Sequence, residues 1–312
     1  MKGFLFFLLL SGLIQTHAQE LFIHTEPASN LPKGVTAVRA FSELYKEGPY
    51  LRSVNVLRAT YGISPSWTVW AQVNISDHHG RLLPEGFVDD EGGIPHTHDI
   101  STGVPLPMLF NGFHFYTKYL FLKKDGRNQH FRMAAFAEGS TSFAAHDEAE
   151  PSLLDDNAGV GAGVIMTELY HRFAASLTLG GIVAADYREK DTGLRIRYGR
   201  AVNYNLSLGY LLFPFQYKNY KQTNVSLYLE FLGRSSGQGQ VFRNEEIVFI
   251  GSDTPAFLEN HYVEIHPGIQ LIFNSNTRLD LGMGFPLINR SYRHTYPLYF
   301  LQIQHYFYRN QP

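Results

Sequence analysis

The sequence predicts an all-β protein, a transmembrane antiparallel β-barrel of about twelve strands that follows an N-terminal signal peptide. Three observations lead to this fold class. Long segments alternate between apolar and polar residues, and the connections between them alternate between short and long. The aromatic share is also high, at 14% with 24 Phe and 19 Tyr, as aromatic girdles at the membrane interfaces would require.

The clearest alternation lies between Tyr198 and Arg234, where two long strands flank an aromatic turn. Their apolar faces are formed by Val202, Tyr204, Leu206, Leu208, Tyr210 and Leu212, and by Val225, Leu227, Leu229 and Phe231. Such a period of two places one face in an apolar medium and the other in a polar one. Soluble strands usually run for about 5–6 residues, whereas a tilted strand that spans a bilayer needs about 9–11. We therefore expect a transmembrane hairpin with its turn at a membrane surface.

The N-terminus reads as a secretory signal peptide over residues 1–18. Lys2 precedes an apolar run from Phe4 to Ile14 that is too short for a helical membrane span, and Ala18 suits a cleavage site before Gln19. An uncleaved membrane anchor is the alternative reading of this segment. Residues 19–33 are polar and irregular, and we expect a periplasmic arm or a segment tucked into the barrel mouth. The barrel then takes residues 34–312.

The other strands follow from the same alternation, in the order of the chain. We expect them at 35–45, 50–63, 68–75, 113–121, 131–138, 159–166, 173–179, 263–271, 278–285 and 299–307. The second of these alternates poorly, because Arg52, Val54, Val56 and Arg58 share one face.

The connections support a membrane barrel over a soluble sandwich. Three long segments, 76–109, 140–157 and 235–260, alternate with short turns along the chain. A barrel with both termini in the periplasm has short periplasmic turns and longer external loops, whereas a soluble sandwich has no reason to show this asymmetry.

Composition excludes several classes of function. The chain has no Cys, so disulfides and thiolate metal sites are not available. A net charge of −2 argues against a nucleic-acid partner. No segment after the signal peptide reaches about 18 consecutive apolar residues, which excludes helical membrane spans.

Short motifs along the chain carry a family resemblance. They are Glu26–Asn30, Tyr61–Ser64, His146–Pro151, Tyr220–Asn224 and Pro267–Gln270. With these motifs the chain resembles an uncharacterised family of Gram-negative outer-membrane proteins related to the transporter barrels of the phenol meta-pathway. The resemblance implies an outer-membrane β-barrel and passage of a small molecule, and it implies no catalytic residue.

The polar faces of the strands are expected to line a lumen that contains charges of both signs. The expected lumen-lining and selectivity residues are Lys118, Arg132, Glu138, Glu230, Glu264, His266, Arg278 and Asp280. They could form a salt-bridged network that fills a narrow barrel, or a polar conduit that selects a solute. Gly159, Gly161 and Gly163 leave a bare strip on this wall, which could admit solute or receive bulky neighbours or the arm.

The expected external loops contain two candidate metal sites. His78, His79, His96 and His98 fall in one loop with Asp99, and imidazole suits zinc or copper, although the spacing matches no closed zinc motif. The alternative is a hydrated loop. A second, acidic loop contains His146, Asp147, Glu148, Glu150, Asp155 and Asp156. It could bind calcium or bridge to lipopolysaccharide through divalent cations, or it could be a solvated loop.

The sequence favours a channel for a small solute over two other classes of function. A plugged structural or binding barrel that acts through its external loops, by contact with metal or lipopolysaccharide, is the first alternative. An enzyme that modifies outer-membrane lipid is the second, and we expect neither catalytic residues nor a cofactor. The expected partners are outer-membrane lipid, lipopolysaccharide and, through the C-terminal aromatic strand, the barrel-assembly machinery.

Overall fold

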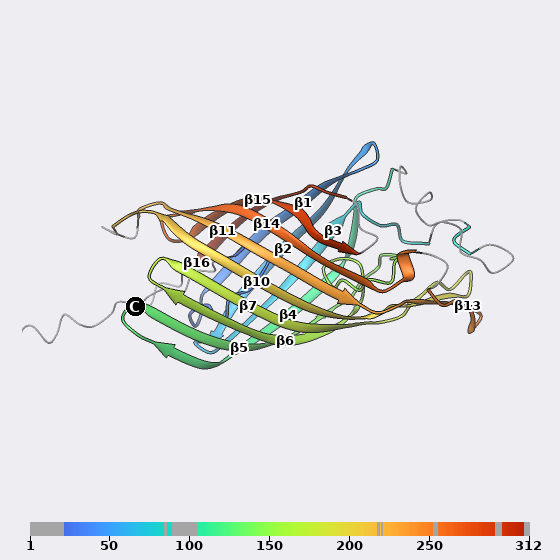
Figure 1. Cartoon of the computed structure of the whole chain (residues 1–312), viewed down its shortest axis with the longest axis horizontal. Helices are drawn as coiled ribbons and strands as arrows, with labels where there is room; N and C mark the ends of the chain where they lie inside the picture. Colours follow the sequence, from blue (N-terminus) through green and yellow to red (C-terminus); the bar gives the residue numbers. More distant parts are fainter. Residues whose placement is uncertain are drawn as a thin grey trace, which may run out of the picture.

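Twelve strands of the described chain close into a single antiparallel barrel in the computed structural model (Figure 1). The structure describes residues 22–83, 86–88, 105–216, 219, 221–251, 255–290 and 295–308, so the expected signal peptide lies outside the described residues. The barrel strands are β1 (Thr36–Glu47), β2 (Tyr50–Ser64), β3 (Trp67–Ser76), β4 (Leu109–Asp125), β5 (Gln129–Ser140), β6 (Gly159–Tyr170), β7 (Phe173–Ala184), β10 (Arg200–Phe213), β11 (Asn224–Ser236), β14 (Asn260–Phe273), β15 (Thr277–Arg290) and β16 (Leu298–Phe307).

The first and last strands pair with each other and close the barrel. β1 pairs with β2 on one side and with β16 on the other, and each remaining barrel strand pairs with its neighbour in chain order. Closure leaves no unpaired edge, which is the condition for a sheet to cross a membrane. None of the described helical segments is long and apolar enough to span a membrane.

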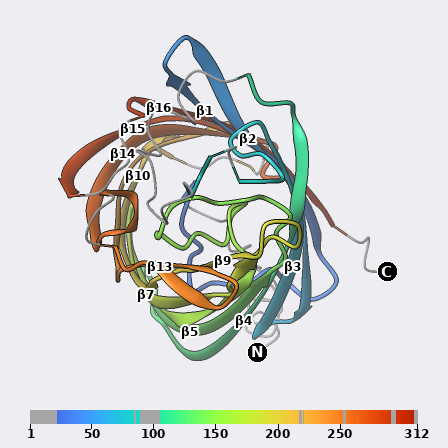
Figure 2. The ribbon, with the colours of Figure 1, turned by 90° about the vertical axis from the view of Figure 1, so that its right-hand side faces the viewer.

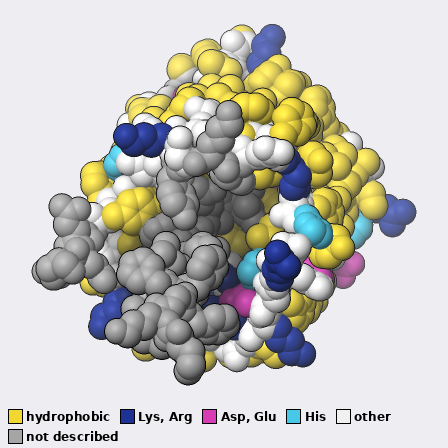
Figure 3. All heavy atoms as spheres, turned by 90° about the vertical axis from the view of Figure 1, so that its left-hand side faces the viewer, with side chains coloured by type: hydrophobic (Ala, Val, Ile, Leu, Met, Phe, Trp, Pro, Cys, Tyr) yellow, Lys and Arg dark blue, Asp and Glu magenta, His cyan; other side chains and the backbone are white. Residues whose placement is uncertain are grey.

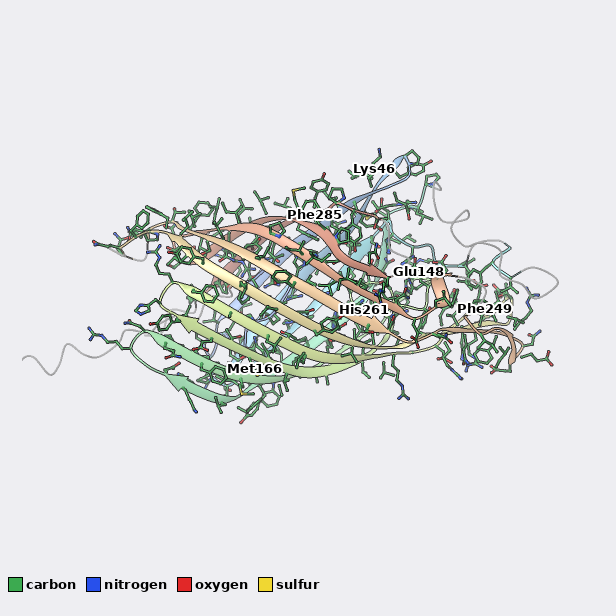
Figure 4. The ribbon with its side chains drawn as sticks, in the orientation of Figure 1. Lys46, Glu148, Met166, Phe249, His261 and Phe285 are labelled. Atoms are coloured by element: carbon green, nitrogen blue, oxygen red, sulfur yellow. The ribbon has the colours of Figure 1, made fainter. Side chains whose placement is uncertain are left out.

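Side chains alternate between the two faces of the wall, as the sequence predicts. In β3, Ala71 and Ile75 are exposed on the outside, whereas Trp70, Gln72 and Asn74 are buried inside. Hydrophobic side chains cover much of the outer wall seen from the end that carries the short turns (Figure 3). Met166 and Phe285 lie on this outer wall (Figure 4). Strands of 10 to 17 residues with an apolar exterior confirm the expected transmembrane barrel.

The two ends of the barrel differ. Short turns lie at the end where β1 begins and β16 ends, shown on the left of Figure 1. The long connections 77–108, 141–158, 185–199 and 237–259 lie at the opposite end. This agrees with the asymmetry expected from the sequence.

A second, small sheet at the long-loop end was not expected from the sequence. It has the order β13-β12-β9-β8, from β8 (Tyr187–Arg188), β9 (Leu194–Arg197), β12 (Gln240–Arg243) and β13 (Glu246–Phe249), and the short helix η1 (Pro255–Phe257) follows it. β12 pairs with β9, so two separate connections form one sheet. Their apolar side chains share a core with the other long connections: Leu83, Phe87, Val88, Ala145, Ala149, Leu194, Ile196, Tyr198, Val241, Phe249, Ala256 and Phe257.

The structure decides two details that the sequence left open. The irregular strand β2 turns Arg52, Val54 and Val56 inward, where all three are buried. The glycine strip of β6 receives bulky neighbours, because a Cβ at Gly163 would lie 2.6 Å from the Phe136 ring, and one at Gly161 would lie 2.6 Å from the Glu138 carboxylate.

An arginine at the centre of the outer wall should destabilise the barrel. Leu206 is 40% exposed halfway along β10, and Ile247 is 51% exposed in the small sheet beyond the barrel. We expect Leu206→Arg to lower the free energy of unfolding in lipid vesicles by about 2–4 kcal/mol, and the control Ile247→Arg by about 0–1 kcal/mol. Urea titration followed by tryptophan fluorescence measures both, and equal losses would contradict a lipid-facing wall at Leu206.

Candidate solute pathway in the barrel

The N-terminal segment of the described chain lies inside the barrel. Residues 22–35 form hydrogen bonds with inward-facing side chains on opposite walls, from Glu230 on β11 to Thr167 on β6 and Thr68 on β3. The blue segment within the ring in Figure 2 is this arm. The sequence left open whether this arm lies in the periplasm or is tucked into the barrel mouth. The described part of the arm lies inside the barrel.

Glu230 holds the beginning of the arm. Its carboxylate accepts hydrogen bonds from the backbone N–H groups of Ile23, His24 and Thr25 at 3.1–3.2 Å, and from the Thr25 hydroxyl at 2.9 Å. The Glu230 side chain is fully buried. A buried carboxylate needs such donors, so the arm supplies the hydrogen bonds that this glutamate would otherwise obtain from water.

A second anchor lies on β15, which β14 separates from β11, and it holds the neighbouring arm residue. The Arg278 guanidinium donates to the carbonyl oxygen of Phe22 at 3.0 Å and to the Asp280 carboxylate at 2.7 Å. Asp280 also accepts hydrogen bonds from Gln270 and Gln302 at 2.8 and 2.7 Å. The paired charges therefore form part of a connected polar network around the arm.

The middle of the arm adds a charge of its own to the interior. The Glu26 carboxylate lies 2.6 Å from the Arg58 guanidinium, 3.7 Å from that of Arg39 and 3.8 Å from the Lys118 amine. Lys118 also donates to the carbonyl oxygens of Pro27 and Ser29. Three basic groups from the wall thus surround one carboxylate from the arm.

The end of the arm packs closely against β2. The Gly34 N–H donates to the carbonyl oxygen of Gly62, and the Gly62 N–H donates to the carbonyl oxygen of Val35. A Cβ at Gly62 would lie 2.2 Å from the Pro32 carbonyl oxygen, a distance that no side chain can adopt. Gly62 therefore allows the backbone of the arm to approach the wall.

All eight residues that the sequence placed in the lumen have side chains on the inner wall, and their role in selectivity stays a prediction. Glu230, Arg278, Lys118 and Arg132 contact the arm, the last through the Ser29 hydroxyl at 2.8 Å. His266 also contacts the arm, through His24 at 3.1 Å. The remaining three contact side chains of the wall: Glu138 with His114 at 3.0 Å, Glu264 with His266 at 2.9 Å, and Asp280 with Arg278.

Sequence reasoning omitted three charged residues that the structure brings together. Arg39 and Arg58 occupy positions that strand alternation places on the inner face, and this pattern could have identified both as lumen residues. Their partner Glu26 belongs to the arm, so strand alternation gave no reason to place it beside them.

A cavity of about 530 Å³ lies between the arm and the long-loop end. His24, Glu264 and His266 line it on the side of the arm, and these side chains are hydrogen-bonded to one another. Both charge signs occur along the lining, in Glu43, Lys46, Glu150, Arg234 and Glu264.

The segment 141–158 between β5 and β6 covers this cavity at the long-loop end, and we call it the mouth loop. It crosses the interior of the ring as the green trace in Figure 2. Glu150 accepts from Arg234 at 3.1 Å and from the Tyr262 hydroxyl at 2.8 Å. Asp147, Glu150 and Asp155 are each at least nine-tenths buried, so the reading of this acidic stretch as a solvated loop is wrong.

The mouth loop also meets two histidines of the expected metal loop. His79 Nε2 lies 3.2 Å from the Asp156 carboxylate and 3.0 Å from His146 Nδ1, and His78 Nε2 lies 3.9 Å from the same carboxylate. His96 and His98, which the sequence grouped with them, lie outside the described residues.

Negative charge around His79 controls its protonation. Burial alone would lower the pKa of the His79 imidazole, but the hydrogen bond and charge of Asp156, with two further carboxylates, raise that pKa to about 9. Burial first, and then the charge of Asp156, raise the pKa of Asp155 well above its ordinary value. This end of the cavity is therefore a buried site with an excess of carboxylates.

A closed antiparallel barrel with an apolar exterior and a charged, hydrogen-bonded interior defines this protein as an outer-membrane β-barrel. No protein-family model matches the chain, and no curated protein matches it. Among solved structures it is similar to the COG4313 outer membrane channel from Pseudomonas putida F1, with a TM-score of 0.60 and 11% identity over 92% of this chain and 100% of that one. This fold is the one that the sequence resemblance implied.

Two porins overlap less well with the chain. The KdgM porin gives a TM-score of 0.42 with 8% identity, over 87% of this chain and 99% of its own. OmpF of Salmonella typhi gives a TM-score of 0.36 with 11% identity, over 90% and 98%. At these scores they add nothing to the assignment of the fold.

Loss of the Glu230 charge should release the arm. The chain has no Cys, so Ala28→Cys, at a fully buried arm position, introduces a unique thiol. Hydrogen bonds to a charged group contribute about 1.5–3 kcal/mol each, so we expect Glu230→Gln to raise the maleimide labelling rate of that thiol by about tenfold or more. Glu245→Gln, at an exposed glutamate of the small sheet, is the control, and equal rates in both backgrounds would show that Glu230 does not hold the arm.

Proposed function

We propose that the protein is a gated outer-membrane channel for a small polar solute and that its N-terminal arm is the gate. One observation carries this proposal: the chain's own arm, held by non-covalent polar contacts, occupies a lumen whose wall is charged and hydrogen-bonding. A purely structural barrel of this size could be filled by side chains from its strands alone.

The cavity supports passage of a small solute. Its volume of about 530 Å³ falls in the range of about 300–1,000 Å³ typical of small-molecule sites. Acidic and basic side chains line it on several sides, among them Glu43, Glu264 and Arg234. Such a lining favours a polar solute with both donor and acceptor groups over a hydrocarbon.

The contacts of the arm support a gate that can open. The arm contributes backbone groups and a few polar side chains, and its partners Glu230, Lys118 and Arg278 stay on the wall. Water or a solute can replace hydrogen bonds of this kind at a small net cost. Gly34, with φ of 79°, joins the arm to β1, and glycine is the residue that allows the chain to turn there without strain.

A plugged binding barrel is the second candidate function. The arm and the mouth loop bound the cavity from its two ends, so a solute could be held there without passing through. A barrel of this kind would bind a ligand in the cavity and conduct nothing, with or without the arm in place.

Conductance of single-charge variants separates the two functions. We expect the wild-type protein in planar bilayers to give small, intermittent currents, and Glu230→Gln and Glu26→Gln to raise the open probability about tenfold, because each loses charged contacts with the arm or wall. Liposome swelling with small polar solutes should increase in parallel.

Glu245→Gln serves again as the control, because it removes a carboxylate far from the arm, in the small sheet. Absence of conductance and of swelling in the wild type, in Glu230→Gln and in Glu26→Gln would contradict a channel and leave the binding barrel. Unchanged open probability, with clear currents in all proteins, would contradict the arm as the gate.

A further inference from the structure

We propose that His78, His79 and Asp156 bind a divalent transition-metal ion, of the zinc or copper type, which fastens the mouth loop to the barrel wall. The two histidines follow β3, and the aspartate belongs to the mouth loop just before β6. One potential ligand atom from each residue lies within 4.8 Å of the other two. This ligand set differs from the four histidines that the sequence grouped, because Asp156 comes from a distant segment.

The distances suit an ion bound by nitrogen and oxygen. Two ligands at about 2.0–2.1 Å from a tetrahedral zinc ion are about 3.3 Å apart. The Asp156 carboxylate oxygen is 3.2 Å from His79 Nε2 and 3.9 Å from His78 Nε2. All three ligand atoms lie within 4.8 Å of one another, so an ion at their centre would draw them together.

The second ring nitrogen of His78 already has a partner. His78 Nδ1 is hydrogen-bonded to the Tyr45 hydroxyl, which leaves Nε2 directed at Asp156. The neighbouring His146 donates from Nε2 to the Glu150 carbonyl oxygen at 2.9 Å, so its Nδ1 faces His79. Metal-binding histidines are commonly oriented by such hydrogen bonds on their second nitrogen.

An unpaired oxygen of a buried carboxyl group beside the site points to a cation. Asp155 is 5% exposed and lines the same cavity as His78 and Asp156. Its Oδ2 has no hydrogen-bonding partner among the described residues. A buried polar oxygen without a partner is costly, and a nearby divalent cation, or a water bound to it, would remove that cost.

The ligand types select the class of metal. Two imidazoles and one carboxylate suit zinc, copper or nickel, whereas calcium and magnesium prefer sites built from oxygen atoms. Three protein ligands leave at least one coordination position free. His78 and Asp156 are part of the cavity lining, so a bound ion would lie beside the cavity.

Titration of the purified full-length barrel with Zn²⁺ tests the site. We expect one Zn²⁺ per barrel by calorimetry, no comparable binding of Ca²⁺ or Mg²⁺, and affinity at least about tenfold weaker in His79→Asn and in Asp156→Asn. His130→Asn is the matched control, because His130 forms the same kind of pair with Asp125 at 3.0 Å near the short-turn end.

Two further measurements keep the test decisive. Electron paramagnetic resonance of the Cu²⁺-loaded wild-type protein should show coupling to imidazole nitrogen, which requires no variant to fold. His96→Asn with His98→Asn should leave Zn²⁺ binding unchanged. Binding that survives His79→Asn and Asp156→Asn, binding that is lost with His96 and His98, or oxygen-only Cu²⁺ ligation would each overturn the proposal. None of these outcomes depends on whether the barrel conducts.

Discussion

The structure depends on one constraint: every backbone polar group that crosses the hydrocarbon must be paired within the protein. Pairing of β1 with β16 meets that constraint by removing both edges of the sheet. A closed sheet has one face toward lipid and one toward its own interior. Alternate side chains of each strand therefore face lipid and the polar interior. The charged side chains of the strands therefore face the interior, because that is the side of the wall where charges can find partners.

Closure creates a second problem, which the N-terminal arm solves. The inner wall carries groups such as Glu230 and Arg278 that are buried where the arm lies against them. The arm brings backbone donors to the glutamate and a backbone carbonyl to the arginine. Because these partners are main-chain groups, the fit depends on the path of the arm more than on its side chains. Gly62 permits that path where the backbone comes closest to the wall.

The long-loop end is organised by a different force, namely apolar packing. The connections 77–108, 141–158, 185–199 and 237–259 contribute to one hydrophobic cluster beyond the barrel. That cluster holds Ala145 and Ala149 of the mouth loop, and thereby positions Asp156 near His78 and His79. Lys46, Glu148 and Phe249 mark this end of the molecule (Figure 4). The cavity thus lies between an arm held by polar contacts and a loop held by apolar ones.

The sequence by itself determined the barrel, the number of its strands and the facing of residues such as Ala71 and Gln72, because strand alternation is local and depends only on which solvent each face meets. It also placed Glu230, Glu264 and Arg278 on the inner wall.

Only the tertiary structure decided which groups meet there. Glu26 joins Arg58 across 32 positions, and His79 joins Asp156 across a strand pair. The small sheet stayed hidden for the same reason, since its strands of two to four residues are too short to show a period and pair between separate connections. Contacts between distant segments depend on the path of the whole chain, and no local pattern records that path.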